Sequence, residues 1–199
     1  LLVLGLTLSF WIDIQLFWLM SLYLILNILY SAAFKKLRFV DILFLTIFYL
    51  ARIVAGSITG NIDLTFLFVA FSGFLFVALG SLKRLGEIKF LSGLKNTQVS
   101  GRGYRPADEV YVKLIVVISS IISIAHLAWY INSENVLKTF KTPGFLWGIV
   151  LILSGWIIRL FVLTNRGKSQ DPLSFCLQDK SSFIIAFLCI ALILSATVI

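Results

Sequence analysis

The chain has 199 residues, of which 60% are hydrophobic and only 13% are charged, and its mean hydropathy is +1.02. A soluble domain averages about 25% charged and about 45–50% apolar residues, so this composition excludes an ordinary soluble protein. The formal net charge is +8. Because the basic residues cluster at the ends of apolar segments, they fit a membrane surface and phosphate-bearing ligands better than nucleic acid.

Seven apolar segments are predicted to be membrane helices, because runs of about 20 apolar residues cross about 30 Å of hydrocarbon. In chain order the segments cover residues 1–11, 14–33, 39–59, 63–83, 110–131, 145–165 and 182–199. The first segment is shorter than the others, and we expect it to be truncated. We therefore predict an all-α, polytopic membrane helix bundle that forms one domain over residues 1–199.

The basic residues are distributed unevenly between the loops. About 14 of the 17 Lys and Arg residues lie in three regions, which follow the second, fourth and sixth segments. An excess of Lys and Arg marks cytoplasmic loops. We therefore expect a multi-pass protein of the inner (plasma) membrane, with these three basic regions in the cytoplasm.

The fourth segment ends in SLKRLGEIKF, residues 81–90. Lys83 and Glu87 are four residues apart and Arg84 and Glu87 are three apart, so on a helix the carboxylate can meet either cation. These charges could simply mark a helix end at the membrane surface. Alternatively, they form an anion clamp, in which two cations grip phosphate oxygens and Glu87 holds them or ligates a metal.

The third segment carries two charges of its own. Asp41 and Arg52 are eleven residues apart, close to three helical turns, so they share a face and lie about 16 Å apart along the axis. Arg52 falls well inside the membrane, where a charge costs at least about 2.5–3.5 kcal/mol and needs a partner, a wet cavity or a function. Tyr30 and Lys35 lie with Asp41 around one predicted cytoplasmic hairpin.

Two further regions contribute candidate residues. Arg159 and Arg166 are seven residues apart on one face of the sixth segment, and this spacing suggests another wall of a charged cavity. The loop after the fourth segment is about 26 residues long, which favours a functional loop. Its start, KRLGEIKFLSGLK, could form a short amphipathic helix over the membrane face, or it could be a solvated connector. The loop also contains SGRGYR, with Arg102 and Tyr104, which is a weak match to a phosphate-binding loop.

The order of these motifs resembles a known family. The stretch YSAAFKKLRFVDILFLTIFYLARIVAG, followed by SLKRLGEI, resembles the UbiA superfamily of membrane prenyltransferases, and the branch of decaprenyl-phosphate phosphoribosyltransferase most of all. GRGYR and RLFVLTNRGKSQDPLSFCLQDK resemble later segments of a bacterial UbiA subgroup, so the resemblance covers nearly the whole chain. Phe34 stands where this branch usually has Leu. The matching positions are Lys35, Arg52, Ala55, Gly56, Lys83, Arg84 and Glu87.

The resemblance implies a nine-helix bundle of which these seven segments are the last seven. The two missing helices would carry the first aspartate-rich motif, which binds Mg²⁺ and diphosphate, so we expect the main Mg²⁺ ligands upstream of residue 1. Glu87 is the one metal ligand that we expect here, and we expect residues 1–199 alone to be inactive. Lys83, Arg84 and Glu87 occupy the place of the second aspartate-rich motif, which favours the phosphoribosyl-transferring branch.

The implied activity is Mg²⁺-dependent group transfer between a diphosphate-bearing co-substrate and a polyprenyl lipid. Phosphoribosyl transfer to polyprenyl phosphate fits best, with Lys83, Arg84 and Glu87 as catalytic residues. Prenyl transfer to an aromatic acceptor is one alternative, and a non-catalytic lipid-binding or transport protein is another. The expected substrate-binding residues are Tyr30, Lys35, Asp41, Arg52, Arg102, Tyr104, Arg159 and Arg166. We expect Lys35, Arg52, Lys83 and Arg84 to meet in a single pocket at the inner leaflet, shaped to bind pyrophosphate.

Overall fold

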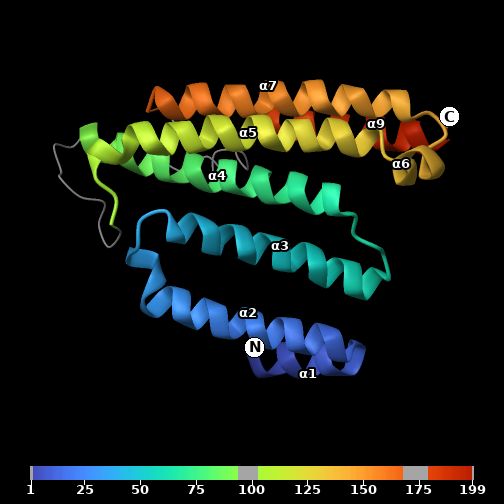
Figure 1. The fold of residues 1–199 in the computed structure, drawn as a ribbon, viewed down its shortest axis with the longest axis horizontal. Coiled ribbons are helices and arrows are strands. Elements are labelled where there is room, and N and C mark those ends of the chain that lie inside the picture. Colours follow the sequence, from blue (N-terminus) through green and yellow to red (C-terminus); the bar gives the residue numbers. More distant parts are fainter. Residues whose placement is uncertain (1, 94–102, 168–178, 199) are drawn as a thin grey trace.

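A computed structural model describes residues 2–93, 103–167 and 179–198, and within these ranges every regular element is a helix (Figure 1). The prediction of an all-α bundle is therefore confirmed. The longer helices are α1 (Leu2–Ile12), α2 (Ile14–Ala32), α3 (Val40–Gly60), α4 (Phe66–Gly93), α5 (Glu109–Ile131), α7 (Leu146–Asn165) and α9 (Lys180–Val198). The shorter ones are η1 (Phe34–Lys36), η2 (Pro106–Asp108), α6 (Glu134–Thr139) and η3 (Pro143–Phe145).

Six of the described helices are long and apolar enough to cross a membrane: α2, α3, α4, α5, α7 and α9. All seven predicted segments fall on helices, but α1 has only 11 residues, or about 16 Å at 1.5 Å per residue. The described residues thus provide six candidate spans rather than seven. Large Leu, Ile, Phe and Trp side chains are exposed along these helices, as expected for surfaces that face lipid.

Helix α4 extends ten residues past its predicted end, because the charged stretch after residue 83 continues the helix instead of starting a loop. Its 28 residues correspond to about 42 Å, clearly more than the hydrocarbon thickness. The last three turns of α4 therefore carry the motif charges on a rigid helix.

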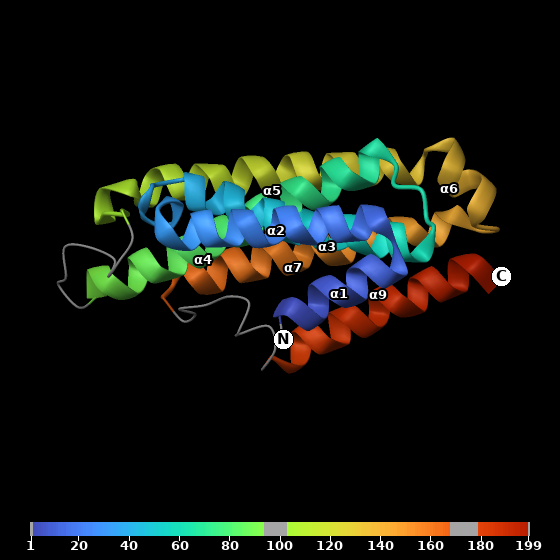
Figure 2. The same cartoon turned by 90° about the horizontal axis from the view of Figure 1, so that it is seen from below.

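Successive helices run in opposite directions, and α2, α3, α4 and α5 lie side by side in chain order (Figure 1). Helix α1 packs on α2, and α9 packs on α7 (Figure 2). The ends of α2, α4 and α7 and the starts of α3 and α5 lie at one end of the bundle (Figure 1). The described residues that directly follow α2, α4 and α7 thus lie at the same end, as the loop charges predict.

A buried apolar cluster supports this charged end of the bundle. It consists of Ile42, Leu85, Ile88, Tyr104 and Val112, which come from α3, α4, α5 and the segment before η2. Since α3 and α4 pack together through these side chains, the polar residues beside them are held at fixed positions.

Candidate functional site

The candidate site is built around Arg84, whose side chain is only 1% exposed. Its Nε lies 2.5 Å from Oδ2 of Asp41 on α3. Its Nη1 lies 2.6 and 2.7 Å from the two carboxylate oxygens of Glu87, one turn further along α4. The predicted contact between Arg84 and Glu87 is therefore present, and Asp41 is a second carboxylate partner from another helix.

Tyr104 reaches the same cluster from the segment before α5. Its hydroxyl donates a hydrogen bond to Oδ1 of Asp41 at 2.5 Å and accepts one from the backbone N–H of Phe39 at 2.9 Å. Burial and the hydrogen bond to Asp41 raise the pKa of Tyr104, so the hydroxyl stays protonated and keeps donating. We call Asp41, Arg84, Glu87 and Tyr104 the ion-pair cluster.

The segment that carries Tyr104 is tied to the turn between α2 and α3. Arg38 donates from Nε to the carbonyl oxygen of Gly103 at 2.6 Å, and from Nη1 to Asp108 at 3.3 Å. A Cβ atom at Gly103 would lie 2.6 Å from the carbonyl oxygen of Lys36, so the close approach of the two backbones requires glycine. Phe39 has a φ of 63°, and its ring packs edge-on against that of Tyr104.

Two more predicted residues lie beside the ion-pair cluster. Lys83 lines a cavity of about 70 Å³ together with Tyr49, which is room for about two water molecules. Tyr30, on α2, is close enough to Asp41, Lys83, Arg84 and Glu87 to interact with their charges. The structure thus brings together six of the residues that the sequence singled out: Tyr30, Asp41, Lys83, Arg84, Glu87 and Tyr104.

The remaining candidates lie elsewhere. Lys35 and Arg166 are exposed at the charged end of the bundle, and Arg102 lies outside the described residues. Arg159 pairs with Asp179, with contacts of 2.5 and 3.0 Å. Asp179 also accepts hydrogen bonds from the backbone N–H and the hydroxyl of Ser182, so this pair fastens the start of α9 to α7.

Arg52 has a different environment from Arg84. Its Nη2 donates a hydrogen bond to the hydroxyl of Tyr23 on α2 at 3.0 Å. Its guanidinium carbon lies 5.0 Å from the ring centre of Tyr49 and 5.7 Å from that of Tyr23. From the helical rise, Arg52 lies about 16 Å from Asp41 along α3, so it is not part of the ion-pair cluster.

We expected the cations Lys35, Arg52, Lys83 and Arg84 to share one pocket, and in the described part of the chain they do not. Arg84 is already neutralised by Asp41 and Glu87, which leaves it little net charge for an added phosphate. Lys83 is the cation of the clamp motif that lines the small cavity beside the ion-pair cluster. Arg84 and Glu87 of the clamp motif thus form structural ion pairs, whereas Lys83 lines a cavity.

Asp41 and Glu87 do not fit a Mg²⁺ site in this arrangement. Both carboxylates pair with Arg84, and Asp41 also accepts from Tyr104. The described residues contain no group of three or more His, Cys, Asp or Glu side chains that could hold a metal. Since Mg²⁺ needs several free oxygen ligands, Glu87 in this arrangement is not suited to hold it.

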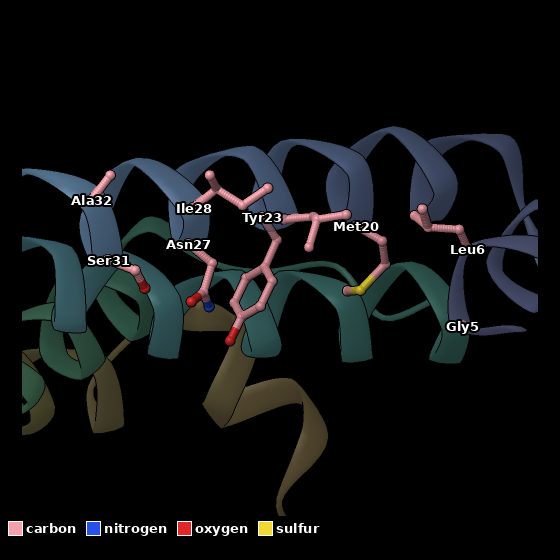
Figure 3. Close-up of a pocket in the computed structure, with 9 residues that line it drawn as sticks. Gly5, Leu6, Met20, Tyr23, Asn27, Ile28, Ser31 and Ala32 are labelled. Carbon is pink, nitrogen blue, oxygen red and sulfur yellow. The ribbon is translucent and has the colours of Figure 1, made fainter. Parts of the chain in front are cut away.

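A cavity of about 840 Å³ lies between α1 and α2 (Figure 3). Most of its lining is apolar, but Tyr23, Asn27 and Ser31 of α2 also face it. The sequence analysis did not find this cavity. Two partners of Arg52 were also not predicted. Tyr49 lies three residues before Arg52 on α3, and this helical spacing could have indicated the contact. Tyr23 lies on α2, and no local sequence pattern relates it to Arg52.

Comparison with known proteins finds relatives but no named reaction. The chain is 30% identical over 172 residues to "Nodulation protein NoeC" of Azorhizobium caulinodans, an alignment that covers 85% of this chain and 56% of NoeC. It is 29% identical over 180 residues to "Uncharacterized protein y4nM" of Sinorhizobium fredii, covering 89% of this chain and 34% of y4nM. The chain thus spans about half and about a third of the lengths of these relatives. No family model matches the chain.

Proposed function

We propose that this chain is the membrane part of a UbiA-type transferase, which moves a phosphoribosyl group from a diphosphate donor to a polyprenyl phosphate. One observation carries the proposal. Six residues predicted from the motifs, which come from four separate segments, converge at the end of the bundle where the basic regions lie. A cluster at the membrane surface suits a reaction that joins a water-soluble diphosphate to a lipid.

In the proposed reaction, an oxygen of the lipid phosphate attacks the anomeric carbon of phosphoribosyl diphosphate. A new carbon–oxygen bond forms, the bond to the diphosphate breaks, and the diphosphate leaves with the electron pair. The chemistry needs a cation beside the leaving group, because negative charge develops there. We assign this role to Lys83, because it lines a cavity beside the cluster.

The ion-pair cluster supports Lys83 indirectly. Arg84 fixes the last turns of α4 against α3 through Asp41, and Tyr104 fixes the following segment to the same carboxylate. These contacts orient Lys83 without touching the substrate, so Asp41, Arg84 and Tyr104 are positioning residues. We expect dependence on Mg²⁺, through carboxylates other than Asp41 and Glu87.

The test uses the full-length protein with Mg²⁺, polyprenyl phosphate and labelled phosphoribosyl diphosphate, in parallel with prenyl diphosphate and aromatic acids. We expect label in the lipid fraction only with the first pair. Transfer of a prenyl group to an aromatic acid would favour the prenylation alternative. No transfer with either pair would favour a lipid-binding or transport protein.

The matched variants are Lys83→Ala and Lys138→Ala. A charge-assisted hydrogen bond is worth about 1.5–3 kcal/mol, so Lys83→Ala should reduce transfer about 10- to 100-fold while the protein stays folded. Lys138 pairs with Glu134 on α6, far along the chain from the cluster and exposed, and its removal should leave transfer unchanged. Equal activity of both variants would remove the role of Lys83.

A further inference from the structure

Arg52 is held near the middle of the membrane. Its partner Tyr23 is the tenth of the 19 residues of α2, about 14 Å from either end of that helix at 1.5 Å per residue. Tyr49 lies one turn before Arg52 on α3, toward the charged end of the bundle. The guanidinium is thus directed back toward mid-membrane instead of toward the nearer end of α3 at Gly60.

The positive charge of Arg52 is only partly compensated there. Two aromatic faces and one hydroxyl surround it, and cation–π contacts are favourable in such a setting. Within the described ranges, however, no carboxylate lies within ion-pair distance of Arg52, and its side chain is exposed. A charge at this depth is costly unless it has a partner, so the site is suited to receive an anion.

The hydroxyl of Tyr23 is available to the same anion. It accepts its hydrogen bond from Arg52, so its own hydrogen can be donated to a third group. An anionic oxygen placed between them would receive one hydrogen bond from the guanidinium and one from the phenol. The pair therefore provides two hydrogen-bond donors for a carboxylate or a phosphate.

Tyr23 also connects Arg52 to the cavity between α1 and α2. Asn27 and Ser31 follow Tyr23 at intervals of four residues, and Figure 3 shows the three side chains on the same side of α2. In the described part of the chain, neither the Asn27 amide nor the Ser31 hydroxyl has a hydrogen-bond partner. The other end of the cavity is apolar, with Leu6 and Met20.

We propose that this cavity binds an anionic amphiphile, whose acidic group pairs with Arg52 and Tyr23 and whose hydrocarbon tail lies against Leu6 and Met20. The polar row of Asn27 and Ser31 accommodates oxygens near the acidic group. This site shares no residue with the ion-pair cluster, although Tyr49, which Arg52 contacts, also lines the small cavity at Lys83. The proposal does not depend on the transferase activity.

The experiment measures binding to the full-length protein in nanodiscs of zwitterionic lipid, by titration calorimetry. The probes are dodecyl phosphate, dodecanoate and dodecanol, which share a tail and differ in the head group. At least one anionic probe should bind, and should do so at least about ten times more tightly than dodecanol. Comparison of the two acids then shows whether the site takes a phosphate or a carboxylate. Equal binding of all three probes would overturn the proposal.

Variants locate the anion. We expect Arg52→Gln to weaken binding of the anionic probe at least tenfold and Tyr23→Phe to weaken it several-fold, whereas Lys138→Gln should not change it. If Arg52→Gln does not fold, Tyr23→Phe still decides, because it keeps the ring and removes only the hydroxyl. Unchanged affinity in Tyr23→Phe would contradict the two-point site.

Lys83→Ala separates this proposal from the transferase. The anionic probe should bind the Lys83→Ala protein as it binds the wild type. If binding is lost in Lys83→Ala and kept in Arg52→Gln, the anion binds at the charged end and the mid-membrane site is refuted. Failure of the transfer assay would leave the binding result untouched.

Discussion

Arg84 and Arg52 lie on neighbouring helices and have opposite environments. Arg84 is buried and contacts two carboxylates, whereas Arg52 is exposed and, among the described residues, contacts a hydroxyl and two aromatic rings but no carboxylate. A buried charge with its partners in place is a structural element, because the partners would be left unpaired without it. A charge that lacks a counter-charge is free to bind one. The environment of each arginine, more than its place in a motif, thus indicates its role.

The largest effect is expected for Arg84→Ala. This change leaves Asp41 buried with an unpaired charge, and breaking a buried pair in this way costs about 3–5 kcal/mol. The free energy of unfolding in mixed micelles measures the loss. The double variant Arg84→Met with Asp41→Leu removes both charges and should recover part of it. A folded, fully stable Arg84→Ala protein would contradict the structural role.

The next largest effect is expected for Gly103→Ala. The added Cβ would meet the carbonyl oxygen of Lys36 at 2.6 Å, and overpacking of this kind costs about 1–3 kcal/mol. The shift would also move Tyr104 away from Asp41. Gly56→Ala is the control, because a Cβ there meets nothing within 4 Å. Equal stability of the two variants would show that the approach at Gly103 is not needed.

Arg52→Gln should behave in the opposite way to Arg84→Ala. Arg52 has no carboxylate partner among residues 2–93, 103–167 and 179–198, so its removal relieves the cost of a charge in the membrane, while the contacts with Tyr23 and Tyr49 are lost. We expect the free energy of unfolding to change by less than about 1 kcal/mol, with stabilisation as the favoured sign. The same micelle assay applies. A loss as large as that of Arg84→Ala would remove the contrast between the two residues.

The pair of Arg159 and Asp179 is expected to give the smallest effect. Hydrogen bonds from Arg159 and Ser182 hold the pKa of Asp179 well below its usual range. Because the pKa is lowered in the folded state, the pair stabilises the protein above the ordinary Asp pKa of about 4. This contribution is lost as the pH falls through the lowered pKa.

Asp179→Asn tests this dependence. The variant should be less stable than the wild type at neutral pH, and the difference in unfolding midpoint should shrink as the pH falls below about 4. Ser181→Ala is the control, because neither Ser nor Ala titrates in this pH range. Its difference in unfolding midpoint from the wild type should not change with pH. A constant difference for Asp179→Asn would mean that the pair adds nothing to stability.

Much of the fold could be predicted from the sequence, because the length and hydropathy of apolar segments are enough to predict membrane helices. The boundaries of α2, α3, α5 and α7 agree with their predicted segments to within a few residues. The end of α4 was missed, since charged residues look like a loop but continue a helix equally well. The short helix α6 was missed because six residues carry too little periodicity.

The residues of the ion-pair cluster were singled out from the sequence, but their arrangement was predicted only in part. The pairing of Arg84 with Glu87 follows from helical spacing. The pairing of Arg84 with Asp41, and the arrival of Tyr104 from 20 residues further on, depend on tertiary packing that no local pattern encodes. The prediction of one pocket shared by the four cations was wrong for the same reason. Residue spacing along one helix does not show which side chain of a neighbouring helix a cation will contact.

The length of α4 has a consequence for the lipid environment. At about 42 Å, the helix exceeds the thickness of most bilayer cores, so it must tilt or protrude. The anchoring of its last turns to α3 and to the segment before α5 opposes free tilting, which leaves protrusion on the basic side as the simpler solution. The protein should therefore tolerate thin membranes better than thick ones. In a thin membrane the additional exposed turns of α4 are already polar, whereas a thicker hydrocarbon core would bury the charges of Glu87 and Lys89.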